Sequence, residues 1–409
     1  MLSRAALGRV VTMAIGVGAG PFVQLVATPW LARIYSPVNF GQLTLFSSFA
    51  GVLIAVSCLR YETTIAVVDD ELVATGVWVA LLSALLLFLL ANIALLTGLP
   101  QVWFPQFAAL GSKIWGVPIA AFCGALALVG SQLSLRQGHY FKNATIRSGQ
   151  TILFVALALI STDLGLIYAN VLSGVAVGFA VIFYLAKEIP AVAATQVRKL
   201  ASQYKKYTLL LAPTALLDAA ALAVPVLVIG HAYGLEATGH YSQILRLVGA
   251  PLILGGAVVG QLFLKRSGEI FRAGQSSRPL VWRCVSALSA NAVLLLVVLL
   301  TAGEYFCGLL LGSAWRVDTI FLLLVTTPLM LRMVVSPVSM VFITHNKVGI
   351  GVRWQIGYFV STIGVLYLAS RYLSFEGFLA VYGAHEALMY AVYLYLANLA
   401  AGSRRTMNE

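Results

Sequence analysis

The chain has 409 residues, of which 60% are hydrophobic and only 10% are charged, against about 25% charged in an ordinary soluble domain. This composition excludes a soluble globular protein. A net charge of +12 would suit a nucleic-acid ligand, but the basic residues lie at the ends of apolar stretches, so membrane orientation and anionic lipid headgroups explain them better.

Apolar stretches of roughly 20 residues follow one another along the chain, each long enough to cross a bilayer core of about 30 Å. The first stretch follows basic residues, as in a signal peptide, but it is too long for one and we expect it to be retained. The connections are too short to hold a soluble domain. The sequence predicts an all-α polytopic membrane protein with twelve spans over residues 10–33, 40–59, 72–97, 114–135, 144–161, 164–186, 207–231, 239–264, 283–302, 317–343, 350–370 and 376–401.

Basic residues alternate between the two sides of these spans. Of the 26 Lys and Arg, 20 fall on the side of the N-terminus and four on the other, while Arg246 and Arg332 fall inside spans. Because cytoplasmic loops carry the excess of Lys and Arg, both termini are predicted to be cytoplasmic.

The longest inner connection lies near the middle of the chain and divides it into two halves. We predict a six-helix bundle over residues 1–190, a cytoplasmic linker over 191–206, and a second six-helix bundle over 207–409. Corresponding prolines in the two halves, such as Pro21 and Pro213, are typical of transporters built from repeats. Prolines inside spans favour bent helices around a cavity.

Charged residues deep inside predicted spans are the candidate site, because such residues are costly in a bilayer and tend to be functional. Arginine suits a phosphate ligand, since its guanidinium stays charged and grips two oxygens at once. We therefore expect Arg246, Arg332 and Arg33 to bind an anionic substrate in a central cavity. Asp218 and Glu386 are the candidate coupling or counter-charge residues. Two alternatives stay open: Asp218 and Arg246 form a neutralising ion pair, and Glu386 with His385 forms a buried structural pair.

Enzymatic chemistry has little support in the sequence. The acidic run Asp69-Asp70-Glu71 is either a metal-binding motif or, as we expect, a solvated turn leading into a helix. The motifs of zinc proteases, serine hydrolases and ATPases are absent, and the four cysteines lack metal-ligand spacing. We predict a protein that is not an enzyme, with no catalytic residue, no metal and no cofactor.

Several short motifs resemble the polysaccharide-biosynthesis membrane proteins, the Wzx-type flippases of O-antigen and other lipid-linked oligosaccharides. The motifs are ARIYSPVNFG at residues 32–41, RYETTI at 60–65, ATGHYS at 237–242 with Leu245-Arg246-Leu247 and Pro251, and LGSAWR at 311–316 with Pro328 and Ser336-Pro337. They are short and are distributed over most of the chain, from residue 32 to residue 337.

The resemblance implies membership of the multidrug/oligosaccharidyl-lipid/polysaccharide (MOP) exporter superfamily, with two six-helix bundles around a cavity that opens to alternate faces. It implies an undecaprenyl-pyrophosphate-linked oligosaccharide, moved across a bacterial inner membrane for surface polysaccharide or lipopolysaccharide synthesis. The resemblance implies that Arg246 is a cavity arginine that contacts the substrate's charge, and Arg33 matches a family position near the first outer loop. A polysaccharide polymerase and other assembly proteins are the implied partners, besides anionic lipids. The alternatives are a small-molecule exporter, a polymerase or ligase of the same pathway, and a scaffold.

Overall fold

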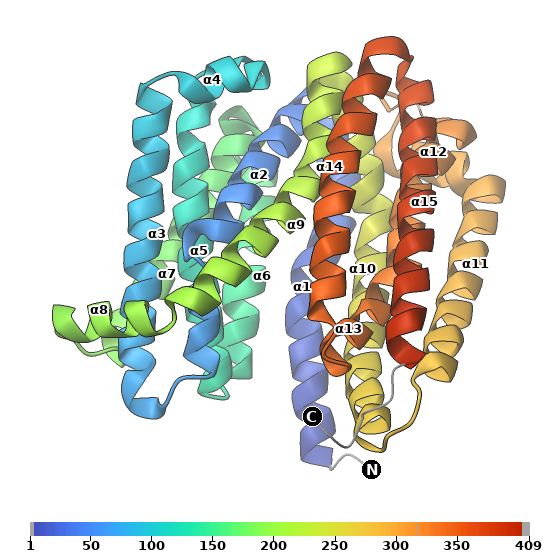
Figure 1. The fold of residues 1–409 in the computed structure, drawn as a ribbon. Coiled ribbons are helices and arrows are strands. Elements are labelled where there is room, and N and C mark those ends of the chain that lie inside the picture. The colour runs from blue at the N-terminus through green and yellow to red at the C-terminus, as the bar shows by residue number, and fades with distance from the viewer. Residues whose placement is uncertain (1–3, 316, 403–409) are drawn as a thin grey trace. The chain divides into compact units, whose positions relative to one another are not determined.

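The computed structural model describes residues 4–315 and 317–402, and its chain divides into two compact units, Met1–His231 and Ala232–Glu409 (Figure 1). The secondary structure of the described residues is helical throughout. This confirms the predicted all-α class.

The N-terminal unit is organised around α5, which packs against α2, α3, α6 and α7, while α1 packs along α6. Its elements are α1 (Arg4–Ile34), α2 (Pro37–Ser57), η1 (Tyr61–Ala66), η2 (Asp70–Leu72), α3 (Val73–Leu96), α4 (Leu99–Trp103), η3 (Pro105–Trp115), α5 (Gly116–Arg136), α6 (Tyr140–Ile160), η4 (Thr162–Leu164), α7 (Gly165–Glu188), α8 (Ala194–Gln203) and α9 (Lys205–Ala232). α8 lies crosswise to α3 near one end of that helix (Figure 1).

Small residues allow α5 to approach its neighbours closely. A Cβ added to Gly130 would lie 2.8 Å from Val181 of α7 and 3.3 Å from Ile146 of α6.

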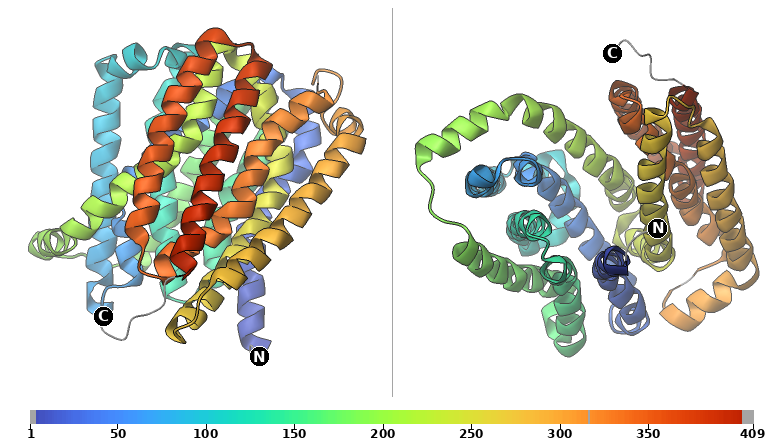
Figure 2. Two further views of the ribbon diagram at one scale, coloured as in Figure 1. Left: turned by 45° about the vertical axis from the view of Figure 1, so that its right-hand side comes forward. Right: turned by 90° about the horizontal axis from the view of Figure 1, so that it is seen from below.

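The C-terminal unit places α12 against α10, α11 and α15, and α15 also packs against α14. Its elements are α10 (Gly234–Arg272), α11 (Arg278–Leu311), α12 (Thr319–Val335), η5 (Ser336–Met340), α13 (Val341–Thr344), α14 (Val348–Tyr372) and α15 (Phe375–Gly402). Its long helices run alongside one another (Figure 2). Asp318 caps α12, because its carboxylate accepts a 2.7 Å hydrogen bond from the backbone N–H of Phe321.

The predicted span at 317–343 is interrupted. The α-helix ends at Val335, and Ser336-Pro337 opens the 3₁₀ segment η5 before α13 resumes. Proline lacks a backbone N–H and cannot continue the hydrogen bonds of an α-helix, which explains the break. Pro337 is buried, with its Cα 3.8 Å from where a Cβ of Gly260 on α10 would lie.

Each of the twelve predicted spans coincides with a helix when α12, η5 and α13 are counted together. Among the described residues, eight helical segments are long and apolar enough to cross a membrane: Pro37–Ser57, Asp70–Leu96, Pro105–Arg136, Tyr140–Ile160, Thr162–Glu188, Leu211–Ala232, Arg278–Leu311 and Thr319–Thr344. The chain is thus a multi-pass membrane protein. Further spans, the cytoplasmic termini and the domain boundaries at 190 and 207 stay predictions.

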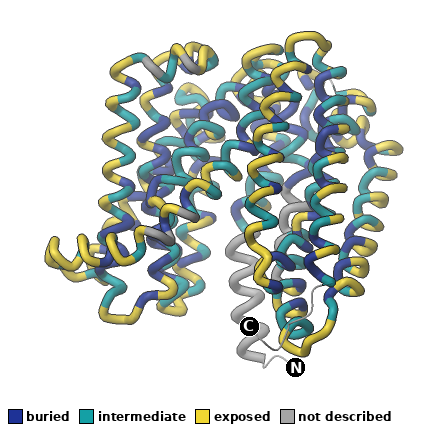
Figure 3. Tube along the Cα trace, in the orientation of Figure 1, coloured by how far each residue is buried: buried dark blue, intermediate teal, exposed yellow. Residues whose placement is uncertain are grey.

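The exposed side chains agree with a lipid-facing surface. Exposed residues follow the outer length of α3 in Figure 3, and they include the large apolar side chains of Leu86, Leu90 and Leu96. An apolar surface of this kind is unfavourable in water and suits contact with lipid.

Candidate functional site

A buried polar cluster lies inside the C-terminal unit, between α10, α12, α14 and α15. We call it the Glu386 cluster. Its members are Tyr241, Arg332, Tyr358, Ser361, Tyr382, His385, Glu386 and Tyr390. Polar groups are rare at such a depth in membrane helices, because each needs a partner in place of water. A group of them that includes ionisable side chains is therefore a candidate functional site.

Glu386 is the centre of this cluster and is only 2% exposed, near the middle of α15. Its Oε1 accepts a 2.8 Å hydrogen bond from the hydroxyl of Tyr358 on α14. The Nδ1 atom of His385 lies 3.7 Å from the same Oε1, which is too long for a hydrogen bond and short enough for electrostatic attraction if the imidazole is protonated. The carboxyl group therefore has one hydrogen-bond donor, Tyr358, and one neighbour, His385, whose attraction depends on whether the imidazole carries a proton.

The other side of the His385 ring is held by α14. The Nε2 atom lies 3.0 Å from Oγ of Ser361. Since that contact occupies Nε2, the tautomer of the imidazole decides whether Nδ1 presents a proton or a lone pair towards Glu386.

Arg332 supplies the positive charge of the cluster. It lies in the last turn of α12, shortly before the break at Pro337, and is half-buried. Its guanidinium interacts electrostatically with Tyr390, Tyr358 and Tyr382 and, more weakly, with Glu386. A cation at the C-terminus of a helix is favoured by the helix dipole.

Aromatic rings shield the cluster. The Trp354 ring stacks on Tyr358 at 5.0 Å and on Tyr393 at 3.9 Å between centroids. Its indole Nε1 donates to the carbonyl of Met389 at 3.2 Å, which ties α14 to α15. Tyr241 of α10 and Tyr382 of α15 share a side-chain hydrogen bond. These contacts hold α10, α14 and α15 in register around the carboxyl group.

The structure brings two of the five predicted site residues together, Arg332 and Glu386. Arg246 also belongs to the C-terminal unit, where it lies half-buried on α10. Arg33, near the end of α1, and Asp218, on α9, belong to the N-terminal unit and are exposed. The ion pair of Asp218 with Arg246 and the central cavity between the two bundles both stay predictions.

The tyrosines of the cluster were missed at the sequence level. Tyr241, Tyr358, Tyr382 and Tyr390 are all buried, with exposures between 4% and 8%. The signal that could have found two of them is spacing, because Tyr382, Glu386 and Tyr390 follow one another at four-residue intervals and so share one face of a helix.

A second, smaller polar cluster lies between α2 and α3 in the N-terminal unit. Glu62 of η1 is 3% exposed, and its carboxylate lies 3.4 Å from the guanidinium of Arg60. Burial raises the pKa of the Glu62 carboxyl above its usual range, and the Arg60 charge offsets this only in part. Nearby, Arg136 donates to the Ile65 carbonyl at 2.7 Å and to Asp70 at 2.6 Å. Asp70 is thereby paired with an arginine, which agrees with a structured turn before α3.

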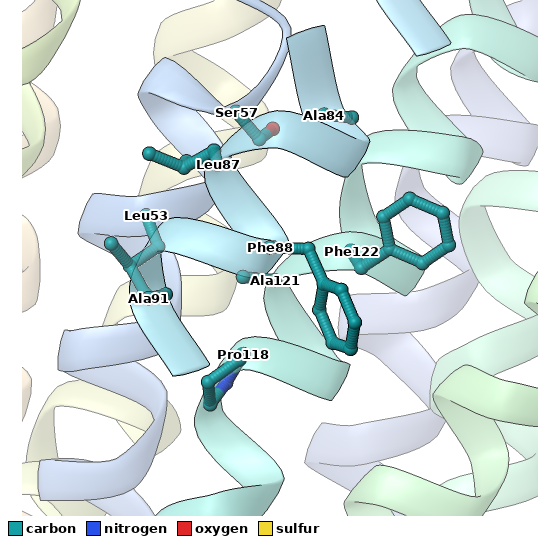
Figure 4. Close-up of a pocket in the computed structure, with 9 residues that line it drawn as sticks. All are labelled: Leu53, Ser57, Ala84, Leu87, Phe88, Ala91, Pro118, Ala121 and Phe122. Atoms are coloured by element: carbon teal, nitrogen blue, oxygen red, sulfur yellow. The ribbon is translucent and has the colours of Figure 1, made fainter. Parts of the chain in front are cut away.

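The structure of the N-terminal unit also contains a small cleft between α2, α3 and α5, shown in Figure 4. Its volume is about 10 Å³, and Pro118, Phe88 and Leu53 are among its lining residues. This is space for a single water molecule and far below the size of a ligand pocket. Within the described residues, no three His, Cys, Asp or Glu side chains come together as metal ligands would.

The sequence matches no family model and no curated protein at a significant level. Solved structures match nearly all of it. The lipid II flippase MurJ in an inward closed conformation has a TM-score of 0.69 at 11% identity, covering 92% of this chain and 86% of that chain. An inward-facing multidrug resistance MATE family transporter of the MOP superfamily has a TM-score of 0.65 at 14% identity, covering 96% and 98%. The MATE multidrug transporter DinF-BH has a TM-score of 0.63 at 11% identity, covering 94% and 93%.

The chain has the fold of these transport proteins. The neighbours are transporters and a flippase rather than enzymes. The resemblance to the Wzx-type flippases is neither confirmed nor contradicted by them and stays a prediction.

Proposed function

We propose that the protein is a flippase that moves undecaprenyl-pyrophosphate-linked oligosaccharides from the cytoplasmic to the periplasmic leaflet of a bacterial inner membrane. The observation that carries this proposal is the likeness of the whole fold to a lipid II flippase, at a TM-score of 0.69. The short motifs shared with the Wzx-type flippases point to oligosaccharides of surface polysaccharide or O-antigen as the cargo. A polysaccharide polymerase then receives the flipped unit.

Arginines at membrane depth support an anionic cargo. Arg332 is half-buried, and Glu386 in the same unit attracts its charge. A pyrophosphate with two or more negative charges competes well for a guanidinium, because it offers paired oxygens in the matching geometry. In this proposal the pyrophosphate contacts Arg332, Arg246 and Arg33 in turn. After the pyrophosphate is released, the arginines interact with the carboxylates again.

Glu386 is the proposed coupling residue, with Asp218 as the second counter-charge. When Glu386 is ionised, it holds Arg332; when it is protonated, the attraction is lost and Arg332 is released for the cargo. A change of one proton thus alters the competition between the carboxylate and the pyrophosphate. His385 and Tyr358 provide the polar path for that proton.

The proposal is tested in liposomes that contain the purified protein and a fluorescent undecaprenyl-pyrophosphate oligosaccharide. A membrane-impermeant quencher then reports how much of the label remains in the outer leaflet. We expect fast exchange of label between the leaflets with the protein and slow exchange without it. Equal rates in both vesicles would contradict the proposal.

A small-molecule exporter is the second candidate, because MATE transporters match as much of the chain as the flippase does. The same vesicles distinguish the two. An exporter moves a cationic fluorescent dye and leaves the fluorescent lipid unmoved, whereas a flippase gives the reverse result. A polymerase or ligase would instead lengthen or transfer the oligosaccharide, which mass spectrometry of the extracted lipid detects.

A further inference from the structure

An apolar groove lies on the N-terminal unit between α3, α5 and α7, and none of its lining residues is proposed to bind the cargo. We call it the lateral groove. It encloses about 140 Å³, and apolar side chains form its wall: Val77, Trp78, Leu81, Leu126, Ile182, Leu185, Ala186 and Ile189. One polar atom in this wall, the Trp78 Nε1, is already satisfied, because it donates to the carbonyl of Pro190 at 3.0 Å. The groove therefore presents a purely apolar surface to its occupant.

The position of the groove along the helices is defined by its lining residues. Trp78 lies near the start of α3, and Ala186 lies near the end of α7. Both helix ends are predicted to face the cytoplasm. Ile182 and Phe183 beside the groove are exposed, at 45% and 64%, as expected for side chains in contact with lipid. The groove therefore lies in the cytoplasmic half of the lipid-facing surface.

α8 adds an amphipathic helix at the same end of the unit. Val197, Leu200, Ala201 and Tyr204 form its apolar face and pack on the same core as Val77, Leu126 and Leu185 of the groove. The hydroxyl of Tyr61 donates to the Ala201 carbonyl at 3.0 Å and fixes the helix there. A short helix with one apolar face that lies across the ends of membrane helices is typical of the headgroup region.

The opposite face of α8 is basic. Arg198 and Lys199 are both exposed. Lys187 at the end of α7 is also exposed, and its ammonium lies 4.3 Å from the centroid of the Phe183 ring, beside the groove. These three cations lie at the same end of the N-terminal unit as the groove.

Acidic residues nearby do not cancel this charge. Glu188 is paired with Lys142 at 3.7 Å, and Asp70 is paired with Arg136. Asp69 and Glu71 are exposed and lie directly before α3, the helix that α8 packs against. Lys187, Arg198 and Lys199 outnumber these two carboxylates, so this end of the unit keeps an excess of positive charge.

We propose that the lateral groove binds an anionic phospholipid of the cytoplasmic leaflet. One acyl chain fills the groove between α3, α5 and α7, and the phosphate contacts Lys187 and the basic face of α8. Charge complementarity selects an anionic headgroup over a zwitterionic one, since each basic side chain near the membrane surface adds to the attraction. This site does not depend on which molecule the protein transports.

Native mass spectrometry of the purified protein tests the proposal, with phosphatidylglycerol and phosphatidylethanolamine of identical acyl chains supplied in equal amounts. We expect selective binding of phosphatidylglycerol to the wild type. Arg198→Gln with Lys199→Gln should weaken that binding on the order of 30-fold, given two surface charges. The matched control, Lys265→Gln with Arg283→Gln, removes two exposed cations from the C-terminal unit and should leave binding unchanged.

A second pair of variants tests the groove itself. Ala186→Phe fills the groove from an exposed position, whereas Ala176→Phe adds the same ring to an exposed site elsewhere on α7. We expect the first to abolish selective binding and the second to retain it. Equal binding of both lipids by the wild type would overturn the proposal, as would full selectivity in Ala186→Phe. Because no transport is measured, failure here is distinct from failure of the flippase assignment.

Discussion

The Tyr358 hydroxyl donates a 2.8 Å hydrogen bond to the Glu386 carboxylate where both side chains are buried. Arg332 interacts electrostatically with both of them. Because the carboxylate attracts the guanidinium, the charge of Glu386 contributes to holding Arg332 inside the C-terminal bundle.

The first prediction concerns this pair. Glu386→Gln retains an oxygen that accepts the Tyr358 hydrogen bond but removes the negative charge. We expect the variant to insert and fold, with the dependence of transport on pH lost. Arg332→Ala should abolish transport and lower the melting temperature of the purified protein, because it leaves Glu386 uncompensated. Lipid flipping at several pH values and thermal unfolding in detergent give the two readouts.

The double variant Arg332→Gln with Glu386→Gln decides between coupling and structure. Removing both charges should restore the melting temperature, since neither is left unpaired. Transport should stay absent if Arg332 contacts the cargo. Recovery of both stability and transport would mean that the pair has only a structural role.

The helices and the charged residues of the cluster were predictable from the sequence, whereas its tyrosines were not. Long apolar runs and the rarity of charge at depth identify α12, α15, Arg332 and Glu386. Tyrosine carries no such signal, because it also occurs at membrane surfaces, as the exposed Tyr367 on the same helix as Tyr358 illustrates. Only the packing of α14 on α15 distinguishes the two.

The helix α8 was likewise not foreseen within the predicted linker. Its apolar residues are too few for a membrane span, and their spacing at Val197, Leu200, Ala201 and Tyr204 becomes meaningful only beside the core that they cover. The break at Pro337 was anticipated as a kink, but the 3₁₀ segment that follows depends on contacts with α10.

The second prediction is a pH dependence of stability at Glu62. Its pKa is raised by burial above its ordinary value of 4.5. A carboxyl with a higher pKa in the folded protein contributes stability that is fully present below the unfolded pKa and is lost as pH rises through the folded pKa. Glu62→Gln should therefore melt like the wild type near about pH 4 and at a higher temperature near about pH 8. A constant difference across this range would contradict the assignment.

The third prediction tests the close packing of α5. Gly130→Ala places a methyl group 2.8 Å from Val181 Cγ1, which is closer than carbon atoms approach. We expect a loss of about 1–3 kcal/mol in the free energy of unfolding, as is typical of overpacking. The control Gly149→Ala adds a methyl group at an ordinary 3.7 Å from Val177. Equal free energies of unfolding for the two variants would show that α7 can move aside without a loss of stability.

The fourth prediction is the topology. In a variant without the four native cysteines, a membrane-impermeant maleimide added from the periplasmic side should label cysteines at Leu235 or Ser313. Ser313 is chosen over the neighbouring Gly312, whose φ of +89° disfavours any other residue. A cysteine at the exposed Ala194 on α8 should react only after the membrane is opened. Strong external labelling at Ala194 would overturn the twelve-span topology and, with it, the cytoplasmic position of the lateral groove.

The last prediction concerns Arg246 and Asp218, whose partnership is a hypothesis drawn from their similar depth in consecutive predicted spans. If Arg246 binds the pyrophosphate and Asp218 holds it at rest, Arg246→Ala should abolish flipping while the protein remains inserted. Arg246→Lys should restore only part of the activity, because an ammonium group lacks the paired donors that match a phosphate. Asp218→Asn should have a milder effect, since it removes the resting partner and keeps the cargo ligand.

These variants are compared by flipping of the fluorescent lipid in vesicles with equal protein content. Full activity of Arg246→Ala would remove this residue from the cargo site. A loss of folded protein in each single variant, repaired in the double variant, would assign the two residues to a structural ion pair instead.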